Sequence, residues 1–188
     1  MESDADLVKT YLAGDERALK KLVERHTPAL YNFVYRFTGD SEDAADVVQE
    51  TVLKAWKHLA KYRTEQNFRT WLFTIARNTA IDWLRKKRSV PFSMFETTDE
   101  SGAFNDTLAD PLPLAEEVAA LAEDKVMLEK ALVALSPAYR DVLLLRYQND
   151  FTFDEIGAIL GKPLHTVKSQ HRRALIILRD ILAKRPRL

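Results

Sequence analysis

The sequence has 188 residues, of which 46% are apolar and 30% are charged, so the chain can form a hydrophobic core and is not intrinsically disordered. It contains no cysteine, which excludes a disulfide framework and thiolate metal sites. Its 28 basic and 28 acidic residues balance overall but not locally, because the net charge is −3 over residues 1–60, +6 over 61–88, −8 over 89–127 and +5 over 128–188. Two positive blocks separated by a negative one indicate two contacts with a polyanion.

The sequence carries no recognisable targeting signal. The acidic N-terminus is followed by no apolar run, so we expect no signal peptide. No segment approaches the roughly 18 apolar residues that a membrane span needs. We therefore expect a cytoplasmic protein without membrane insertion.

Helix signals dominate the first 90 residues, and polar caps delimit the first two helices. Ser3 and Asp6 have the spacing of a capping box, which predicts a short helix through Leu12. Asp15 is expected to cap a second helix that runs to about Phe37.

Ser41 is expected to cap a third helix that has acidic residues in its first turn, where the helix dipole favours negative charge. Apolar residues at three- and four-residue spacing predict its inward face: Ala45, Val48, Val52, Ala55 and Leu59. Polar and apolar residues are mixed on its other side: Asp46, Gln49, Glu50, Leu53 and Lys57.

A fourth helix is expected from Phe68 to about Lys87, capped by Asn67. Its predicted core stripe is Phe68, Leu72, Ile75, Thr79 and Trp83. Its opposite face carries Thr70, Thr74, Arg77, Asn78, Ile81 and Arg85, with the aromatic residues Trp71 and Phe73 among them. Aromatic rings among cations suit unpaired nucleic-acid strands, because bases stack on the rings while the cations follow the phosphates. Whether Trp71 belongs to that surface or to the core stays open.

The composition changes between residue 89 and about residue 124, where prolines and acidic residues replace the large apolar ones. Such a segment lacks a core of its own and reads as a linker, although Leu112 to Leu121 can start a helical turn near its end. We therefore predict an all-α protein of two small helical domains. A helix bundle in residues 1–90 is joined by a flexible acidic linker, residues 91–125, to a second bundle in residues 126–188.

Caps also mark the helices of the C-terminal third. Ser136 followed by Pro137 predicts a helix that runs to about Tyr147. Thr152 and Glu155 form a second capping box, and a glycine ends the short helix that follows. A proline then starts the last helix. This layout is that of a DNA-reading helix-turn-helix, whose last helix enters the major groove.

The last helix is expected to begin at Pro163 and to be basic along one side. Its core stripe is Val167, His171, Ala174, Leu178 and Ile181, so we interpret His171 as structural. The remaining sides of its first turns carry side chains that can reach base edges and phosphates: His165, Thr166, Lys168, Ser169, Arg172 and Arg173. An ordinary three-helix bundle with a basic end would show the same spacing.

Five segments, which lie in both predicted domains, resemble one known protein family. Residues 68–85 read FRTWLFTIARNTAIDWLR, and residues 43–56 read DAADVVQETVLKAW. Residues 135–137, 153–156 and 166–169 read LSP, FDEI and TVKS. The first two resemble conserved region 2 and the preceding polymerase-binding helix of the extracytoplasmic-function (ECF) subfamily of sigma-70 type RNA polymerase sigma factors. The last three resemble region 4 of that subfamily.

The resemblance implies a dissociable specificity subunit of bacterial RNA polymerase, which is a transcription initiation factor and not an enzyme. Core RNA polymerase, promoter DNA and an anti-sigma factor are the implied partners, with no cofactor, metal or small-molecule substrate. The implied polymerase-binding residues are Asp46, Gln49, Glu50, Leu53 and Trp56. The implied contacts to the −10 element are Tyr62, Arg63, Asn67, Trp71, Arg77, Asn78 and Arg85. The implied contacts to the −35 element are His165, Thr166, Lys168, Ser169, Arg172 and Arg173.

The recognition helix departs from the family pattern. The family often has a small residue at the position of His165, and an arginine and then a leucine at the positions of Gln170 and His171. The resemblance therefore implies the mode of −35 binding and leaves the −35 sequence open.

Two other classes of function compete with this interpretation. A helix-turn-helix transcription regulator would bind intact duplex without the polymerase, but it leaves the basic, aromatic segment before residue 88 unexplained. A hydrolytic or metal enzyme is disfavoured, because the four histidines show no ligand spacing and no Gly-rich phosphate loop or nucleophile–base pair is suggested.

Overall fold

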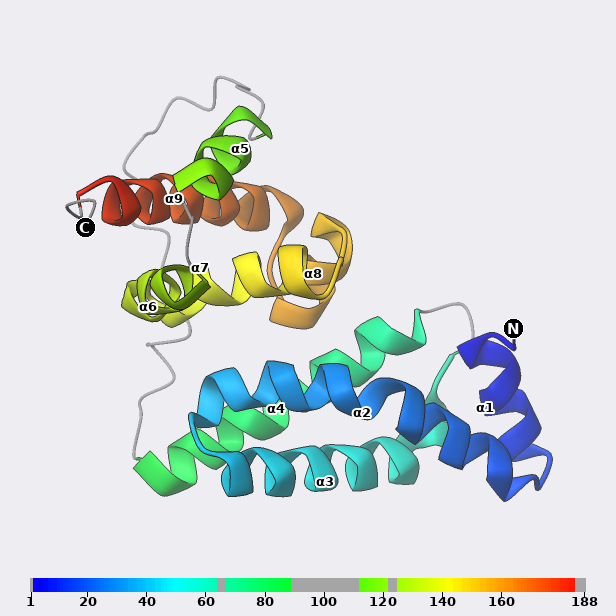
Figure 1. Cartoon of the computed structure of the whole chain (residues 1–188). Helices are drawn as coiled ribbons and strands as arrows, with labels where there is room; N and C mark the ends of the chain where they lie inside the picture. Colours follow the sequence, from blue (N-terminus) through cyan, green and yellow to red (C-terminus); the bar gives the residue numbers. More distant parts are fainter. Residues whose placement is uncertain (1, 64–66, 89–111, 122–124, 185–188) are drawn as a thin grey trace. The chain divides into compact units, whose positions relative to one another are not determined.

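A computed structural model describes residues 2–63, 67–88, 112–121 and 125–184. Regular structure in these ranges is helical throughout and includes no strand, which confirms the predicted all-α class. The chain divides into two compact units (Figure 1). Most of the predicted linker, residues 91–125, lies outside the described ranges, so the boundaries of the domains stay predictions.

The N-terminal domain consists of α1 (Asp4–Leu12), α2 (Glu16–Thr38), α3 (Ser41–His58), the short 3-10 turn η1 (Leu59–Lys61) and α4 (Phe68–Arg88). Helices α2, α3 and α4 pack against one another in all three pairings, and α1 packs against α2. The domain core therefore lies between three long helices.

The predicted caps of α1, α2 and α4 are confirmed. In α1 the Ser3 hydroxyl accepts a hydrogen bond from the Asp6 N–H at 3.1 Å, and the Asp6 carboxylate accepts one from the Ser3 N–H at 3.3 Å. Asp15 caps α2 by accepting from the Arg17 N–H at 2.9 Å. Asn67 caps α4 through its side-chain oxygen. Each cap satisfies backbone N–H groups that have no partner inside the helix.

The N-cap and buried face of α3 differ from the prediction. Its N-cap is Asp40 and not Ser41, because the Asp40 carboxylate accepts two first-turn N–H groups at 2.9 and 3.0 Å. Ala45 is exposed, contrary to expectation. The buried residues of α3 are Ala44, Val47, Val48, Thr51 and Ala55. Thr51 does not register in a hydrophobic pattern, but its hydroxyl donates to the Val47 carbonyl at 2.7 Å and can therefore be buried.

Helix α4 is buried on more than one side, because it packs against both α2 and α3. Its predicted stripe is buried at Phe68, Leu72 and Thr79 and half-buried at Ile75 and Trp83. Phe73, Arg77 and Ile81 were expected on the opposite, exposed face, yet Phe73 is completely buried and the exposed fractions of Arg77 and Ile81 are only 7% and 3%. A helix with two packing neighbours has a wider buried face than one periodic stripe describes.

The described part of the C-terminal domain contains the helices α5 (Leu112–Leu121), α6 (Lys125–Ala134), α7 (Pro137–Leu143), α8 (Phe153–Leu160) and α9 (Leu164–Ala183), with the π turn η3 (Leu144–Gln148) between α7 and α8. The segment predicted as one helix up to Tyr147 is thus α-helical to Leu143 and continues as the π turn η3. Pro163 is the N-cap of α9, one residue before the helix starts.

Helix α9 organises the C-terminal core, since α5, α6 and α7 all pack against it. Apolar side chains from these helices form one cluster: Val118, Ala131, Leu135, Leu143, Ala174, Leu175, Leu178 and Leu182. Helix α5 confirms the helical turn expected near the end of the linker, and its Val118 lies in this core. None of the described helices combines the length and apolar character needed to cross a lipid bilayer.

Candidate nucleic-acid and protein interfaces

The outer side of α3 is a surface of mixed acidic and apolar character. All five residues expected on it are exposed, and we call them the α3 surface: Asp46, Gln49, Glu50, Leu53 and Trp56. Leu53 is 45% exposed and Trp56 is 49% exposed. Large apolar side chains exposed among charged ones are typical of protein-binding surfaces, where aromatic residues contribute much of the affinity.

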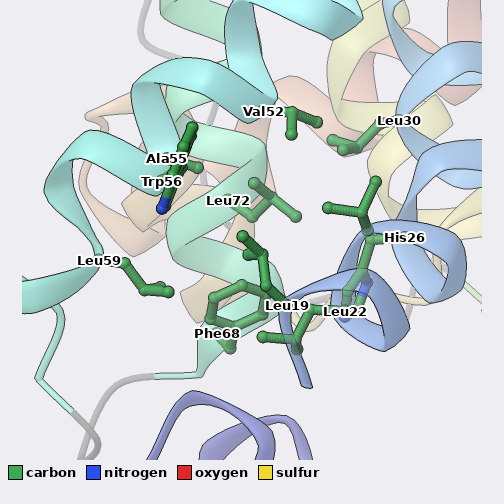
Figure 2. A pocket seen from close by; sticks show the side chains of 11 residues that line it. Leu19, Leu22, His26, Leu30, Val52, Ala55, Trp56, Leu59, Phe68 and Leu72 are labelled. Carbon is green, nitrogen blue, oxygen red and sulfur yellow. The ribbon is translucent and has the colours of Figure 1, made fainter. Parts of the chain in front are cut away.

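A small apolar pocket lies on the inner side of Trp56. Its volume is about 30 Å³, and its walls come from α2, α3, η1 and α4. Figure 2 shows Trp56 and Ala55 on one side of it and Leu22 and His26 on the other. Ligand sites usually have volumes of about 300–1,000 Å³. The pocket is therefore an imperfection of packing behind the α3 surface and not a ligand site.

The loop before α4 is anchored at both ends by the residues predicted to touch DNA. Tyr62 is only 8% exposed, and its ring centroid lies 5.4 Å from that of Phe68 and 5.2 Å from that of Trp71. At the other end, the Asn67 side chain accepts from the backbone N–H groups of Arg69 and Thr70 at 3.0 and 3.3 Å. Residues 64–66 of this loop lie outside the described ranges. Trp71 is half-buried, so it belongs to the aromatic cluster while keeping part of its surface accessible.

The polar residues predicted on the DNA-facing side differ in accessibility. Arg63, Asn78 and Arg85 are exposed, whereas Arg77 is buried. At the end of the helix, Lys87 Nζ lies 2.5 Å from the Asp43 carboxylate of α3 and 4.9 Å from the centre of the Trp83 ring. The surface thus combines exposed cations and an amide with an aromatic cluster, which is the chemistry that suits unpaired strands.

Helix α8 begins at the predicted capping box of Thr152 and Glu155, with N–H to oxygen distances of 2.8 and 3.3 Å.

The turn between α8 and α9 depends on two glycines. Gly161 follows α8 with φ of +66°, a left-handed conformation that glycine adopts without strain. Gly157, inside α8, lies so close to the turn that a Cβ there would be 2.8 Å from the Lys162 carbonyl oxygen. This close approach sets how α8 and α9 meet.

The first turns of α9 present most of the residues predicted to read duplex DNA. His165 and Lys168 are exposed, and Ser169, Arg172 and Arg173 are half-buried. Thr166 is only 9% exposed and lies mostly within the domain. Gln170 is buried, and its side-chain oxygen accepts from Lys162 Nζ at 3.2 Å, which ties α9 to the preceding turn.

Sequence reasoning placed His171 in the core, and the structure confirms this. Its Nε2 lies 3.0 Å from the Tyr147 hydroxyl, and its ring packs edge-on against Phe153 with centroids 5.0 Å apart. Burial, with a smaller contribution from nearby Arg146, lowers the pKa of His171 to about 4, so the ring is neutral near pH 7. Neutral His171 therefore links the recognition helix to the π turn without adding charge to the core.

The π turn itself was missed, because no residue pattern distinguishes it from α-helix. It is closed by Asn149, whose side-chain N–H₂ group donates to the Leu144 carbonyl at 3.2 Å. Asp150 follows with φ of +53°, and Arg146 Nη1 donates to the Phe151 carbonyl at 3.0 Å. The Asn-Asp pair is a signal for a left-handed turn that could have indicated the end of this segment.

Two family models match the chain in the predicted order, Sigma-70 region 2 over residues 22–90 and Sigma-70 region 4 over residues 125–178. The ECF RNA polymerase sigma factor SigL of Mycobacterium tuberculosis is 36% identical over 169 residues, which cover 89% of this chain and 90% of SigL. The chain belongs to the ECF sigma factors. It is thus a transcription initiation factor of RNA polymerase, as the sequence resemblance implied.

Two solved structures share the fold of this ECF sigma factor. CnrH, solved in complex with the cytosolic domain of CnrY, superposes with a TM-score of 0.69 at 27% identity, covering 98% of this chain and all of CnrH. RpoE of Bartonella quintana, solved in complex with the anti-sigma factor NepR, gives a TM-score of 0.64 at 28% identity, covering 89% and 98% of the two chains. In this ECF sigma factor α1 precedes the matched region 2, which begins at residue 22.

Proposed function

We propose that this ECF sigma factor binds core RNA polymerase through the α3 surface. The observation that carries the proposal is the exposure of Leu53 and Trp56 among acidic residues, within the segment matched to Sigma-70 region 2. Glu50 and Asp46 supply negative charge beside these apolar anchors, which favours a basic and apolar partner surface.

The N-terminal domain holds the opened −10 element in this proposal. Exposed Arg63, Asn78 and Arg85 contact the strand, while Trp71 offers part of its ring to a base. Tyr62, Asn67 and Arg77 are buried or engaged in capping, so we assign them to shaping the loop and helix that carry the contacts. Stacking one captured base contributes about 1–3 kcal/mol.

The free-energy cost of opening promoter DNA requires that the polymerase takes part. Opening roughly ten base pairs costs on the order of 14 kcal/mol, because DNA stacking contributes about 1.4 kcal/mol per step. One small helix bundle that traps one or two bases recovers only a fraction of this cost. The sigma factor therefore acts as a subunit, and the larger enzyme supplies the remaining contacts.

The C-terminal domain reads the −35 element as duplex in this proposal. Helix α9 enters the major groove with His165, Lys168 and Ser169 leading, and Arg172 and Arg173 reach bases or phosphates from the next turn. Thr166 is mostly buried, so its role is to set the position of the helix N-terminus.

The cellular location and the regulation of the protein follow from its role in transcription initiation. We propose that it acts in the cytoplasm with the polymerase, that it is not itself an enzyme and that an anti-sigma factor controls it. RpoE of Bartonella quintana, solved with the anti-sigma factor NepR, supports this control by analogy.

Charge reversal with a matched control tests the polymerase-binding proposal. Glu50 and Glu24 are both exposed, and each pairs with a lysine one helical turn away, Lys54 at 2.8 Å and Lys20 at 3.7 Å. We expect Glu50→Arg to reduce assembly with purified core RNA polymerase, measured by native gel and gel filtration, and Glu24→Arg to leave assembly intact. Equal assembly of both variants would refute the role of the α3 surface.

Promoter opening separates the DNA proposal from the alternative of a duplex-binding regulator. We expect Asn78→Ala to leave polymerase assembly intact but to reduce permanganate-detected opening at promoters found by mapping transcript starts on a genomic library. A regulator of the alternative class would bind intact duplex without polymerase and would not redirect transcript starts.

A further inference from the structure

Helix α1 lies before the residues matched to Sigma-70 region 2, yet it is firmly held by the N-terminal domain. The Asp4 carboxylate lies 2.6 Å from Arg25 Nη1 and 2.9 Å from His26 Nε2, both on α2. Leu7 and Val8 are completely buried. Polar contacts at its first turn and apolar contacts at its middle therefore fix the orientation of α1.

The last turn of α1 reaches the α3 surface. The indole Nε1–H of Trp56 donates a hydrogen bond to the Tyr11 hydroxyl, although the two residues are 45 positions apart in the sequence. Tyr11 is half-buried, whereas Trp56 is 49% exposed. The contact thus joins a half-buried side chain of α1 to an exposed aromatic member of the α3 surface.

Packing alone does not set the orientation of the Trp56 ring. Its inner side borders the small pocket, and its outer side is open to solvent. His26, which Asp4 of α1 contacts, lines the same pocket from the α2 side (Figure 2). A hydrogen bond is directional, so the Tyr11 hydroxyl restrains the indole where close packing is missing.

We propose that Tyr11 is a positioning residue of the polymerase-binding surface, which holds the Trp56 indole in the orientation that core RNA polymerase binds. The inference rests on the proposed function of the α3 surface. An aromatic anchor contributes more affinity when its orientation is fixed before binding, because less side-chain freedom is lost on association. Helix α1 thereby adds to an interface whose other members lie on α3.

The first test removes the hydroxyl and keeps the ring. We expect Tyr11→Phe to weaken the affinity of the labelled full-length sigma factor for purified core RNA polymerase, measured by fluorescence anisotropy, about fivefold, which is the effect of one hydrogen bond. Tyr35→Phe is the matched control, since Tyr35 is a 44% exposed tyrosine on α2, and it should leave the affinity unchanged. An unchanged affinity for Tyr11→Phe would overturn the proposal.

A double-mutant cycle with Trp56→Ala shows whether Tyr11 acts through Trp56. We expect Tyr11→Phe to have no further effect in the Trp56→Ala background, whereas the same fivefold loss in both backgrounds would overturn the proposal. The single variant Trp56→Ala distinguishes a failure of the positioning role of Tyr11 from a failure of the polymerase-binding role of the α3 surface. If Trp56→Ala weakens binding and Tyr11→Phe does not, the positioning role fails and the α3 surface stands; if neither weakens binding, both fail.

A spectroscopic measurement distinguishes positioning from general stability. The chain has three tryptophans and therefore three indole N–H resonances in a proton–nitrogen correlation spectrum. We expect Tyr11→Phe to shift the Trp56 resonance, assigned with Trp56→Phe, and to leave those of Trp71 and Trp83 in place. Equal shifts of all three resonances would indicate a change of the whole domain and would overturn the proposal.

Discussion

The substitution Gly157→Ala distinguishes two opposite expectations for α8. Glycine inside a helix costs about 0.5–1 kcal/mol relative to alanine, so helix propensity alone predicts that the substitution stabilises the domain. The structure predicts the opposite sign, because the new Cβ would lie 2.8 Å from the Lys162 carbonyl oxygen. Close carbon–oxygen contacts are ordinarily about 3.3–3.6 Å, so the turn must move by roughly half an ångström or more.

The expected size follows from these two terms. Overpacking of this kind typically costs about 1–3 kcal/mol, which leaves a net destabilisation of roughly 0–2.5 kcal/mol after the gain in helix propensity. The displacement also stretches the hydrogen bond from the Lys162 N–H to the Gly157 carbonyl, now 2.9 Å long. Because this turn joins α8 to α9, affinity for −35 duplex should fall as well.

Backbone hydrogen exchange in the full-length protein measures the effect where it occurs. We expect Gly157→Ala to speed the exchange of core amides in α8 and α9. Ala158→Gly at the neighbouring exposed position is the control, since it measures helix propensity without the steric contact. Slower exchange in Gly157→Ala than in the natural chain would refute the argument.

Three further predictions concern the C-terminal domain. Lys168→Ala should weaken binding of the holoenzyme to −35 duplex in footprinting, because an exposed cation of α9 is lost; unchanged protection would contradict its role. His171 has a pKa of about 4 when folded and an ordinary value of 6.5, so the unfolded chain binds more protons between these values. His171 should therefore make stability fall as the pH decreases from about 6.5 to 4, by up to about 1.4 kcal/mol per pH unit in urea unfolding. Burial also lowers the pKa of His26, which adds a slope of the same sign, so His171→Leu should reduce the slope without removing it. An unaltered slope would exclude a contribution from His171. Thr152→Ala should destabilise the domain by about 1 kcal/mol through loss of the capping box, and an unchanged urea midpoint would argue against that cap.

The sequence predicts features that arise from local chemistry and misses those that arise from packing. The caps at Ser3, Asp15, Asn67 and Thr152 are confirmed because a side chain and nearby N–H groups determine them. Arg77 was misplaced because burial beside two neighbouring helices leaves no trace in a periodic pattern.

The candidate interfaces also combine residues that the sequence predicts with a contact that it does not predict. Four members of the α3 surface, Asp46, Gln49, Glu50 and Leu53, could be predicted from helical periodicity, whereas Trp56 was implied only by the family resemblance. The contact between Tyr11 and Trp56 could not, because it joins residues 45 positions apart through tertiary structure. The roles of the individual DNA-contacting residues stay predictions, which the variants described above test.

The ion pair between Lys87 and Asp43 lowers the number of cations that the basic segment before residue 88 offers to DNA phosphates. Every lysine or arginine that neutralises a DNA phosphate releases a condensed counterion, and the salt dependence of binding reports how many are released. Lys87 already neutralises a carboxylate of its own domain, with Nζ 2.5 Å from the Asp43 oxygen. The salt dependence of −10 strand binding should therefore reflect fewer ions than the sequence charge suggests, and Asp43→Asn should make it steeper.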